Sequence, residues 1–423
     1  MPAAHPASPA RNAHADVLIT GGGLIGQTLA VALAAHGLSS IVVDPASPVT
    51  QLAPDFDGRA SAIASASMAM LGAIGLGDAL DGHGCPIERI WVSDGLQPGE
   101  LDFAPPAGDG PLGVMFENRR LRLALSAMIA ATPLIDLRAP ARSASVQHDA
   151  AGARITLADG SIVTAPLLAV CEGRNSPTRE AAGISSAHWG YRHGAMVGAI
   201  AHERPHDNTA YEIFYPDGPF AILPLPDLPA GDMSAPWPHR SGFVWSTGED
   251  DAPIFARLGP RGFKAEMLKR MGHILGDIQE IAPRGLYPLS FQHAARITAT
   301  RMVLVGDAAH GIHPIAGQGF NLGLRDVATL VEVLVDGARL GLDLGDAQLL
   351  ERYERWRGLD NLSVAAATDG LTRLFGLPGR AASAARRFGL AGVQKSRLAK
   401  RFFMAEARGQ SGDQPKLLAG LTV

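Results

Sequence analysis

The sequence predicts an α/β fold: a Rossmann-like nucleotide-binding domain, a mostly antiparallel β-sheet domain inserted into it, and a helical C-terminal region. Three observations predict this fold. Glycine-rich turns between a strand pattern and a helix pattern occur twice, at residues 16–36 and 302–326. Between them, residues 185–283 change to short alternating runs with many aromatic residues and prolines. From Leu324 onward the pattern is almost entirely helical.

The composition sets limits on the class of protein. The chain has 423 residues, 47% hydrophobic and 18% charged, which is typical of a globular protein with a sizeable core. A net charge of −4 gives no general attraction for nucleic acid, so we expect no nucleic-acid partner. Cys85 and Cys171 form no CxxC pair, which favours a reducing cytoplasm and predicts neither a disulfide framework nor a metal site. No run is apolar enough to predict a membrane span.

The N-terminal elements form a βαβ unit. Residues 16–20 are typical of a buried strand, and the Ala- and Leu-rich run 24–36 is typical of a helix that ends at Gly37. Residues 41–44 form the next strand, which Pro45 ends. We expect further elements in this order: a helix at 59–80, strands at 87–104, a loop at 105–111, a helix at 119–131, a hairpin at 155–163, a strand at 167–170 and a helix near 261–275 within the inserted sheet.

These elements predict a nucleotide-binding domain that is divided in sequence. The expected boundaries are a disordered lead at 1–14, the nucleotide-binding domain at 15–85, 105–184 and 284–365, the inserted sheet domain at 86–104 and 185–283, and the helical region at 366–423.

The first turn carries the pattern GxGxxG, with Leu24 and Ile25 between its second and third glycines. Gly21 allows a tight turn, Gly23 lets the backbone approach a pyrophosphate, and Gly26 lets the helix pack close to its strand. Asp44 ends the next strand, where a carboxylate can accept hydrogen bonds from ribose hydroxyls. The alternative is a plain glycine turn, and the pattern does not separate NAD from FAD.

The second turn begins with Gly306 and Asp307, whose carboxylate can accept a hydrogen bond from a ribitol hydroxyl. The N–H groups of Gly317, Gln318 and Gly319 can face the pyrimidine edge of a flavin, where a helix start stabilises negative charge. A tight β–α connection that needs glycines only for its geometry is the alternative. Two nucleotide-binding turns far apart in the chain indicate one long cofactor, and FAD fits that shape.

Residues 313–326, His-Pro-Ile-Ala-Gly-Gln-Gly-Phe-Asn-Leu-Gly-Leu-Arg-Asp, resemble the signature of the ubiquinone-biosynthesis hydroxylases. These are FAD-dependent aromatic-ring monooxygenases, similar to para-hydroxybenzoate hydroxylase. Residues 57–60, 117–121, 218–225 and 287–289 resemble further family segments, and the likeness extends from Asp16 to about Gly420.

The resemblance implies roles for further residues. Arg59 is expected near the flavin, Asn118 is expected to reach the cofactor, and Pro314 and Asn321 belong to the signature turn over the flavin. Glu172 stands where the family usually has aspartate, in a segment that serves both FAD and the reduced nicotinamide. This departure either changes the use of the nicotinamide or is a neutral change in a loop.

The resemblance also implies a reaction. NAD(P)H, or a partner reductase, reduces FAD, the flavin forms a C4a-hydroperoxide with O₂, and the distal oxygen passes to the ring of a prenylated phenol. The expected wall opposite the flavin comes from Tyr211, Phe214, Tyr215, Phe220 and Leu223, which are equally suited to be ordinary core, and no residue is identified as a catalytic base. The alternatives are a hydroxylase of a soluble aromatic acid, a flavin reductase or dehydrogenase, and a non-catalytic escort for prenyl lipids.

Two features concern metals and partners. His310 and His313 are three residues apart, but the glycine turn accounts for them better than a metal, so we predict no metal site. Residues 373–401 contain eight Lys and Arg, no Asp or Glu, and interleaved apolar residues. This segment either lies on the inner face of a bacterial membrane or docks on the protein body. We therefore expect a cytoplasmic or peripheral membrane protein, and the family also includes members of multi-enzyme assemblies.

Overall fold

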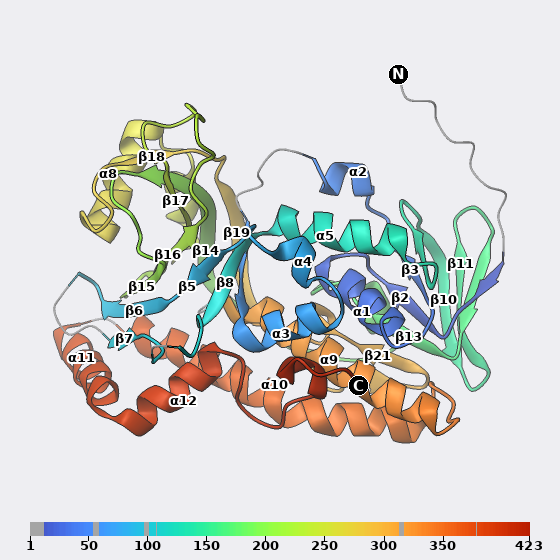
Figure 1. Cartoon of the computed structure of the whole chain (residues 1–423). Coiled ribbons are helices and arrows are strands. Elements are labelled where there is room, and N and C mark those ends of the chain that lie inside the picture. Colours follow the sequence, from blue (N-terminus) through green and yellow to red (C-terminus); the bar gives the residue numbers. More distant parts are fainter. Residues whose placement is uncertain (1–11, 54–58, 97–100, 107, 313–316, 378) are drawn as a thin grey trace.

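A computed structural model describes residues 12–53, 59–96, 101–106, 108–312, 317–377 and 379–423. The predictions for Asp57, His313 and Pro314 lie outside the described residues. The centre of the nucleotide-binding domain is a sheet with the strand order β20-β21-β13-β2-β3-β9, parallel except at β20 (Figure 1). Its strands are β2 (Val17–Thr20), β3 (Ser40–Val43), β9 (Ile135–Arg138), β13 (Leu167–Val170), β20 (Thr298–Ala299) and β21 (Met302–Leu304).

Helices and a small sheet enclose this centre. Helix α1 (Leu24–Ala34) contacts both α5 (Asn118–Ala131) and α9 (Gln318–Arg339). A four-stranded sheet, β1-β12-β11-β10, contacts the central strands β2 and β13. Its strands are β1 (Ala13–His14), β10 (Ser143–Asp149), β11 (Gly152–Leu157) and β12 (Ile162–Ala165). Central strands β2 and β13 are buried at every residue, which explains their unbroken apolar sequences.

A three-stranded sheet, β4-β8-β5, lies between the two large domains (Figure 1). It contains β4 (Ala60–Ala64), β5 (Cys85–Ile87) and β8 (Gly113–Glu117). The shorter helices of this half of the molecule are α2 (Pro48–Gln51), α3 (Ser65–Ala73), α4 (Gly77–Leu80) and α6 (Pro177–Ala181). The prediction of a helix from residue 59 is wrong for residues 60–64. This short run of small residues has no clear periodicity, and its pairing with β8 makes it a strand.

The inserted domain is a nine-stranded, mostly antiparallel sheet with β6 and β15 paired in parallel. Its strands are β6 (Arg89–Asp94), β7 (Leu101–Phe103), β14 (Ser186–His202), β15 (Thr209–Tyr215), β16 (Gly218–Leu225), β17 (His239–Gly248), β18 (Ile278–Glu280), β19 (Gly285–Ala294) and β22 (His310–Gly311). The sheet thus extends past residue 283, where we expected the domain to end, because β19 pairs along β14.

Two short helices, α7 (Ala252–Ala256) and α8 (Pro260–Met271), are packed on this sheet. An apolar core lies between α8 and one face of the sheet, and it includes Ile213, Phe220, Phe263 and Met267. The opposite face of the sheet turns toward the nucleotide-binding domain, since its Ala199 and Leu225 pack with Ala60 of β4.

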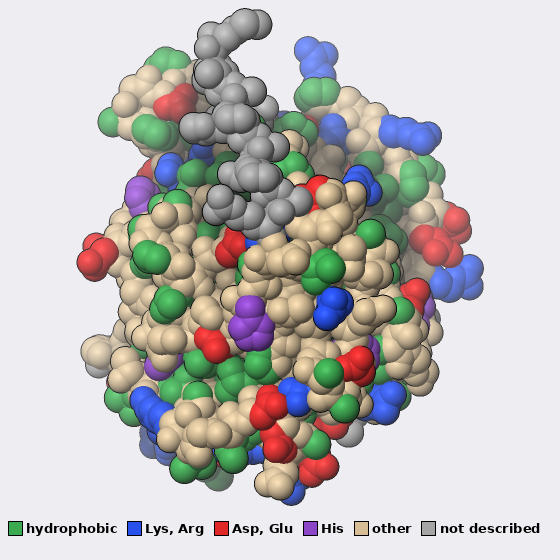
Figure 2. Space-filling view, turned by 90° about the vertical axis from the view of Figure 1, so that its right-hand side faces the viewer, with side chains coloured by type: hydrophobic (Ala, Val, Ile, Leu, Met, Phe, Trp, Pro, Cys, Tyr) green, Lys and Arg blue, Asp and Glu red, His purple; other side chains and the backbone are tan. Residues whose placement is uncertain are grey.

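The C-terminal region consists of α10 (Ala347–Gly376), α11 (Arg380–Lys395), α12 (Arg397–Ala407) and a short 3₁₀ turn, η3 (Lys416–Ala419). Helix α10 runs along the bottom of both large domains in Figure 1 and contacts α9 as well as β15 and β16. Among the described residues, no helix has the length and apolar character needed to span a bilayer. On the side shown in Figure 2, basic and acidic side chains are interspersed.

Candidate functional site

The first glycine-rich turn joins β2 to α1 and is tightly packed at two of its glycines. Gly21 has a φ of +95°, and a Cβ on it would lie 2.4 Å from the carbonyl oxygen of Cys171. A Cβ on Gly26 would lie 1.9 Å from the carbonyl oxygen of Gly21. A Cβ on Gly23 would meet no atom within 4 Å. Gly21 and Gly26 therefore shape the turn, whereas Gly23 borders open space.

The carboxylate of Asp44 closes this turn from the next strand. Its oxygens accept hydrogen bonds from the backbone N–H groups of Gly22 and Ala46, the latter at 2.6 Å. Gly23 caps α1 without a side chain, and Leu24 is the first helical residue. The first N–H groups of the helix are thus available to an anionic ligand, and the positive end of the helix dipole points the same way.

The second turn follows β21 as a short 3₁₀ turn, η1 (Gly306–Ala308). Asp307 lies in it with a side chain that is 43% exposed, which leaves its carboxylate open to a ligand. Arg174 donates to Asp307 at 3.1 Å and to the carbonyl oxygens of Ser290 and Ile312 at 3.0 Å each. We had not predicted this role for Arg174, because nothing near it in sequence indicates its partners.

Helix α9 begins directly after the second turn. Its N-cap is Gly317, with a φ of +63° and no side-chain cap, and Gln318 and Gly319 form its first turn. Asn321 donates to the carbonyl oxygen of Ala62 at 2.8 Å and accepts from the N–H of Ala64 at 2.9 Å. The Asn321 side chain therefore braces α9 against β4, and its place in the turn over the flavin stays a prediction.

The two turns lie next to each other in space, at the carboxyl ends of β2 and β21, with only β13 between these strands. Ile25 of the first turn connects them. A Cβ on Gly306 would lie 3.3 Å from two carbon atoms of Ile25, and a Cβ on Gly323 would lie 2.6 Å from its Cδ1. The N-termini of α1 and α9 thus lie side by side at the same edge of the sheet. This arrangement suits a ligand with two anionic or electron-rich ends.

Comparison with known proteins supports this interpretation. The family model "FAD binding domain" matches residues 14–361. The chain is 44% identical to the ubiquinone hydroxylase UbiL of Rhodospirillum rubrum over 410 residues, which cover 96% of this chain and 93% of that protein. It is 32% identical to the 3-demethoxyubiquinol 3-hydroxylase of Escherichia coli, covering 85% and 89% of the two chains.

This chain belongs to the ubiquinone-biosynthesis hydroxylases. These are FAD-dependent monooxygenases, so the resemblance noted in the sequence is confirmed, as is the expectation of FAD. The fold is also that of p-nitrophenol 4-monooxygenase PnpA from Pseudomonas putida, with a TM-score of 0.76 at 17% identity over 95% of this chain and 100% of that one.

Two further predicted residues of this hydroxylase lie close together. Arg59 is exposed just before β4, and its carbonyl oxygen accepts from the N–H of Asn118 at 3.1 Å. The side chain of Asn118 accepts a hydrogen bond from Ser61 at 2.7 Å. These contacts hold the start of α5 beside β4.

The carboxylate of Glu172 holds a neighbouring helix. One of its oxygens accepts from the hydroxyl of Ser176 at 2.6 Å and from the N–H of Thr178 at 3.1 Å. The other oxygen accepts from the hydroxyl of Thr178 at 2.7 Å. Glu172 thus fixes the start of α6, a structural role that we had not predicted for it.

The expected substrate wall is corrected by the structure. Because alternate residues of a strand point to opposite faces, Tyr211 and Tyr215 lie on the face covered by α8, together with Phe220. The prediction that these three face the flavin side is therefore wrong. Phe214 and Leu223 lie on the opposite face, in an apolar cluster that includes Met115 of β8, and Phe214 stacks on Phe375 of α10 with ring centroids 3.7 Å apart.

A buried charge network supports the second turn of the hydroxylase. Asp326 of α9 accepts from the N–H of Gly306 at 2.9 Å, contacts His310 Nε2 at 2.5 Å and contacts Arg357 Nε at 2.7 Å. Burial by itself would raise the pKa of Asp326, but the charges of His310 and Arg357 outweigh it and lower the pKa to about 2. Arg357 also pairs with Asp360. Sequence spacing gave no signal for this network beyond the single residue His310.

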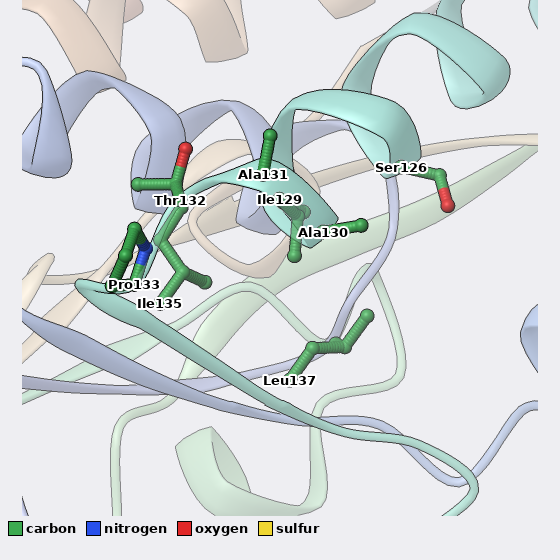
Figure 3. A pocket seen from close by; sticks show the side chains of 8 residues that line it. All are labelled: Ser126, Ile129, Ala130, Ala131, Thr132, Pro133, Ile135 and Leu137. Carbon is green, nitrogen blue, oxygen red and sulfur yellow. The ribbon is translucent and has the colours of Figure 1, made fainter.

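A separate pocket lies between the end of α5 and the start of β9 (Figure 3). It is lined by Ser126, Ile129, Ala130, Ala131, Thr132, Pro133, Ile135 and Leu137. These residues carry no charge. The start of β9 lies at the amino ends of the parallel strands, whereas the two turns lie at their carboxyl ends. The pocket therefore does not belong to the flavin site.

Proposed function

We propose that this chain hydroxylates the aromatic ring of a polyprenylated phenol, with FAD as cofactor and NAD(P)H and O₂ as co-substrates. The observation that carries this proposal is the meeting of the two turns through Ile25, at an edge of the sheet where Phe291 of the inserted domain packs with Ile312 and Leu322. The names of the relatives support the substrate class, since they describe hydroxylases of ubiquinone precursors.

The residues of the site fit FAD. The N-terminus of α1 and the open side of Gly23 would hold the pyrophosphate, and Asp44 would hold the ribose. Asp307 would accept from the ribitol chain, and the N–H groups at Gly317, Gln318 and Gly319 would face the pyrimidine edge of the ring. Bound flavin supplies the activation of O₂ and the transfer of one oxygen atom to the substrate.

The protein's own contribution is to hold the phenol and exclude water. The face of the inserted sheet with Phe214 and Leu223 is apolar, and it packs with Cys85, Met115 and Ala62. Such surroundings hold a ring and keep bulk water from the reacting atoms. A rigid sheet also fixes the orientation of the ring, which lowers the entropic part of the barrier.

The C-terminal helices support a peripheral membrane location. Buried Arg386 pairs with Asp94 of β6 at 2.9 Å, so α11 is docked on the inserted sheet. Phe388, Leu398 and Phe402 nevertheless remain 83%, 79% and 60% exposed. They are accompanied in sequence by Lys395, Arg397, Lys400 and Arg401. Exposed apolar side chains with basic neighbours suit the surface of an anionic bilayer, where a prenylated phenol resides.

Vesicle flotation tests the membrane contact. Phe388→Ser with Leu398→Ser should reduce co-flotation with phosphatidylglycerol vesicles, because the exposed apolar area is lost, and should leave flavin content unchanged. Leu340→Ser is a matched control, since Leu340 is 76% exposed at the end of α9. Equal flotation of both variants would contradict this surface.

Product analysis tests the reaction itself. The purified yellow protein should oxidise NADH or NADPH and place one atom of ¹⁸O₂ on the ring of a geranylated phenol. The rate of this hydroxylation should be much lower with 4-hydroxybenzoate, which has no prenyl chain to bury. A preference for the soluble acid would refute the proposed substrate class.

A further inference from the structure

Glu212 is a carboxylate in an apolar wall. It lies in β15, where its cross-strand neighbours are Val92 of β6 and Ala221 of β16. Ala210 and Phe214 flank it on the same face of the sheet. Glu212 itself is half-buried, and its carboxylate has no hydrogen-bond or ion-pair partner among the residues that the structure describes. An uncompensated carboxylate in such a place is costly, which makes a functional role the better explanation.

This wall borders the turn that is expected to hold the flavin ring. Ala210 and Phe214 belong to one apolar cluster with which Ala62 of β4 is packed. A Cβ on Gly317 would lie 3.3 Å from the Cβ of Ala62. Ala62 thus packs on the same apolar cluster as this face of β15, and it also lies beside Gly317, the N-cap of α9.

The charges packed around β15 are already paired. On β6, Asp94 pairs with Arg386, and Arg89 pairs with Asp102. Strand β16 has no ionisable side chain. The tyrosines of β15 lie on the face of the sheet opposite Glu212. The described charged side chains of α10 all lie at or before position 360. With no described cation beside it, burial raises the pKa of Glu212 to about 7, which suits a group that accepts protons at neutral pH.

We propose that Glu212 accepts the proton of the substrate's phenolic hydroxyl as the ring is hydroxylated. This proposal rests on the proposed function. The phenol O–H bond breaks, its electron pair stays on the phenol oxygen, and the proton forms a new O–H bond on the carboxylate. No electron leaves either group in this step. The ring becomes more electron-rich, and it is then more readily attacked by the oxygen that the flavin supplies.

Glu212→Gln tests the proposal in the flavin-loaded protein with a geranylated phenol. A missing general base should lower the hydroxylation rate on the order of 10²- to 10⁴-fold. The inflection near pH 7 in the rate should disappear, while KM for the phenol stays within a few-fold. A fluorinated, more acidic phenol should restore much of the rate in Glu212→Gln, which a purely structural role would not produce. Glu249→Gln is the control, because Glu249 is 54% exposed just after β17 and should behave as wild type.

The outcomes separate the two proposals. A Glu212→Gln protein with the wild-type rate and pH profile would refute the role of Glu212 alone. If Glu212→Gln does not fold, Glu212→Asp keeps the charge on a shorter side chain, and it should keep the inflection with a lower rate. An Asp variant without an inflection would equally refute the role. A wild-type protein that reduces its flavin but forms no hydroxylated phenol would refute the proposed function, and this proposal with it.

Discussion

Replacing Asp326 by asparagine should be among the most damaging single changes near the flavin site. The Asp326 side chain is fully buried, and it contacts His310 and Arg357, which are themselves almost fully buried. The neutral amide would keep a hydrogen-bond acceptor for Gly306 but would leave the Arg357 charge with only Asp360 beside it. Removing one partner of a buried ion pair costs about 3–5 kcal/mol, because the other charge stays buried without compensation.

The lowered pKa of Asp326 makes this destabilisation depend on pH. The folded value of about 2 is below the ordinary value of 3.8, so the group stabilises the folded state above pH 3.8. That contribution, about 2 kcal/mol, is lost as the pH falls through about 2. The difference in unfolding free energy between wild type and Asp326→Asn should therefore be full at pH 7 and should shrink toward pH 2.

Guanidinium unfolding across this pH range measures the difference, and flavin fluorescence reports whether the Gly306 turn still holds its ligand. Asp343→Asn is a matched control: Asp343 pairs with Arg301 at 2.7 Å, but its side chain is 47% exposed. Such a pair contributes about 0–1 kcal/mol. Equal unfolding midpoints for Asp326→Asn and Asp343→Asn at pH 7 would refute the importance of the buried network.

Three further predictions concern the turns and the inserted sheet. Gly26→Ala should destabilise the apoprotein, because its Cβ would overlap the backbone of Gly21. Gly23→Ala should leave apoprotein stability unchanged and weaken FAD binding. Calorimetry measures the first effect, and FAD titration measures the second. Asp307→Ala should lower the flavin retained through dialysis, and a variant that purifies with full flavin would contradict its contact with the ribitol. Burial lowers the pKa of His202 from 6.5 to about 4, so stability should fall as the pH drops through this range, and His202→Gln should flatten that fall in thermal unfolding.

The fold was largely predictable because its signals are local. Positions 21 and 26 require glycine, because a Cβ there would clash with the backbone. Such glycines can be recognised from the sequence alone. Buried parallel strands such as β2 and β13 are covered on both faces, so their sequences are unbroken apolar runs that can also be recognised directly. The helical C-terminal region likewise follows from residue spacing.

The remaining features depend on partners that are distant in sequence. Alternation in β15 shows that Tyr211 and Phe214 face opposite sides, but only the packing of α8 decides which side meets the flavin. The partnership of Asp326 with Arg357 joins two helices. Glu172 was expected at the cofactor because its segment resembles a family motif, yet its oxygens are used by residues only a few positions later. Sequence reasoning identified the right segments and could not choose among the roles of their side chains.

Ile25 has a consequence for how such a protein can change over generations. This aliphatic side chain belongs to the first turn, and it lies against two glycine positions of the second turn and its helix, Gly306 and Gly323. A bulkier residue would collide with the Gly306 turn and with α9, and a smaller one would leave a void between them. Adaptation at the adenosine end is therefore tied to the isoalloxazine end through a few methyl and methylene groups, and substitutions there should occur in compensating sets.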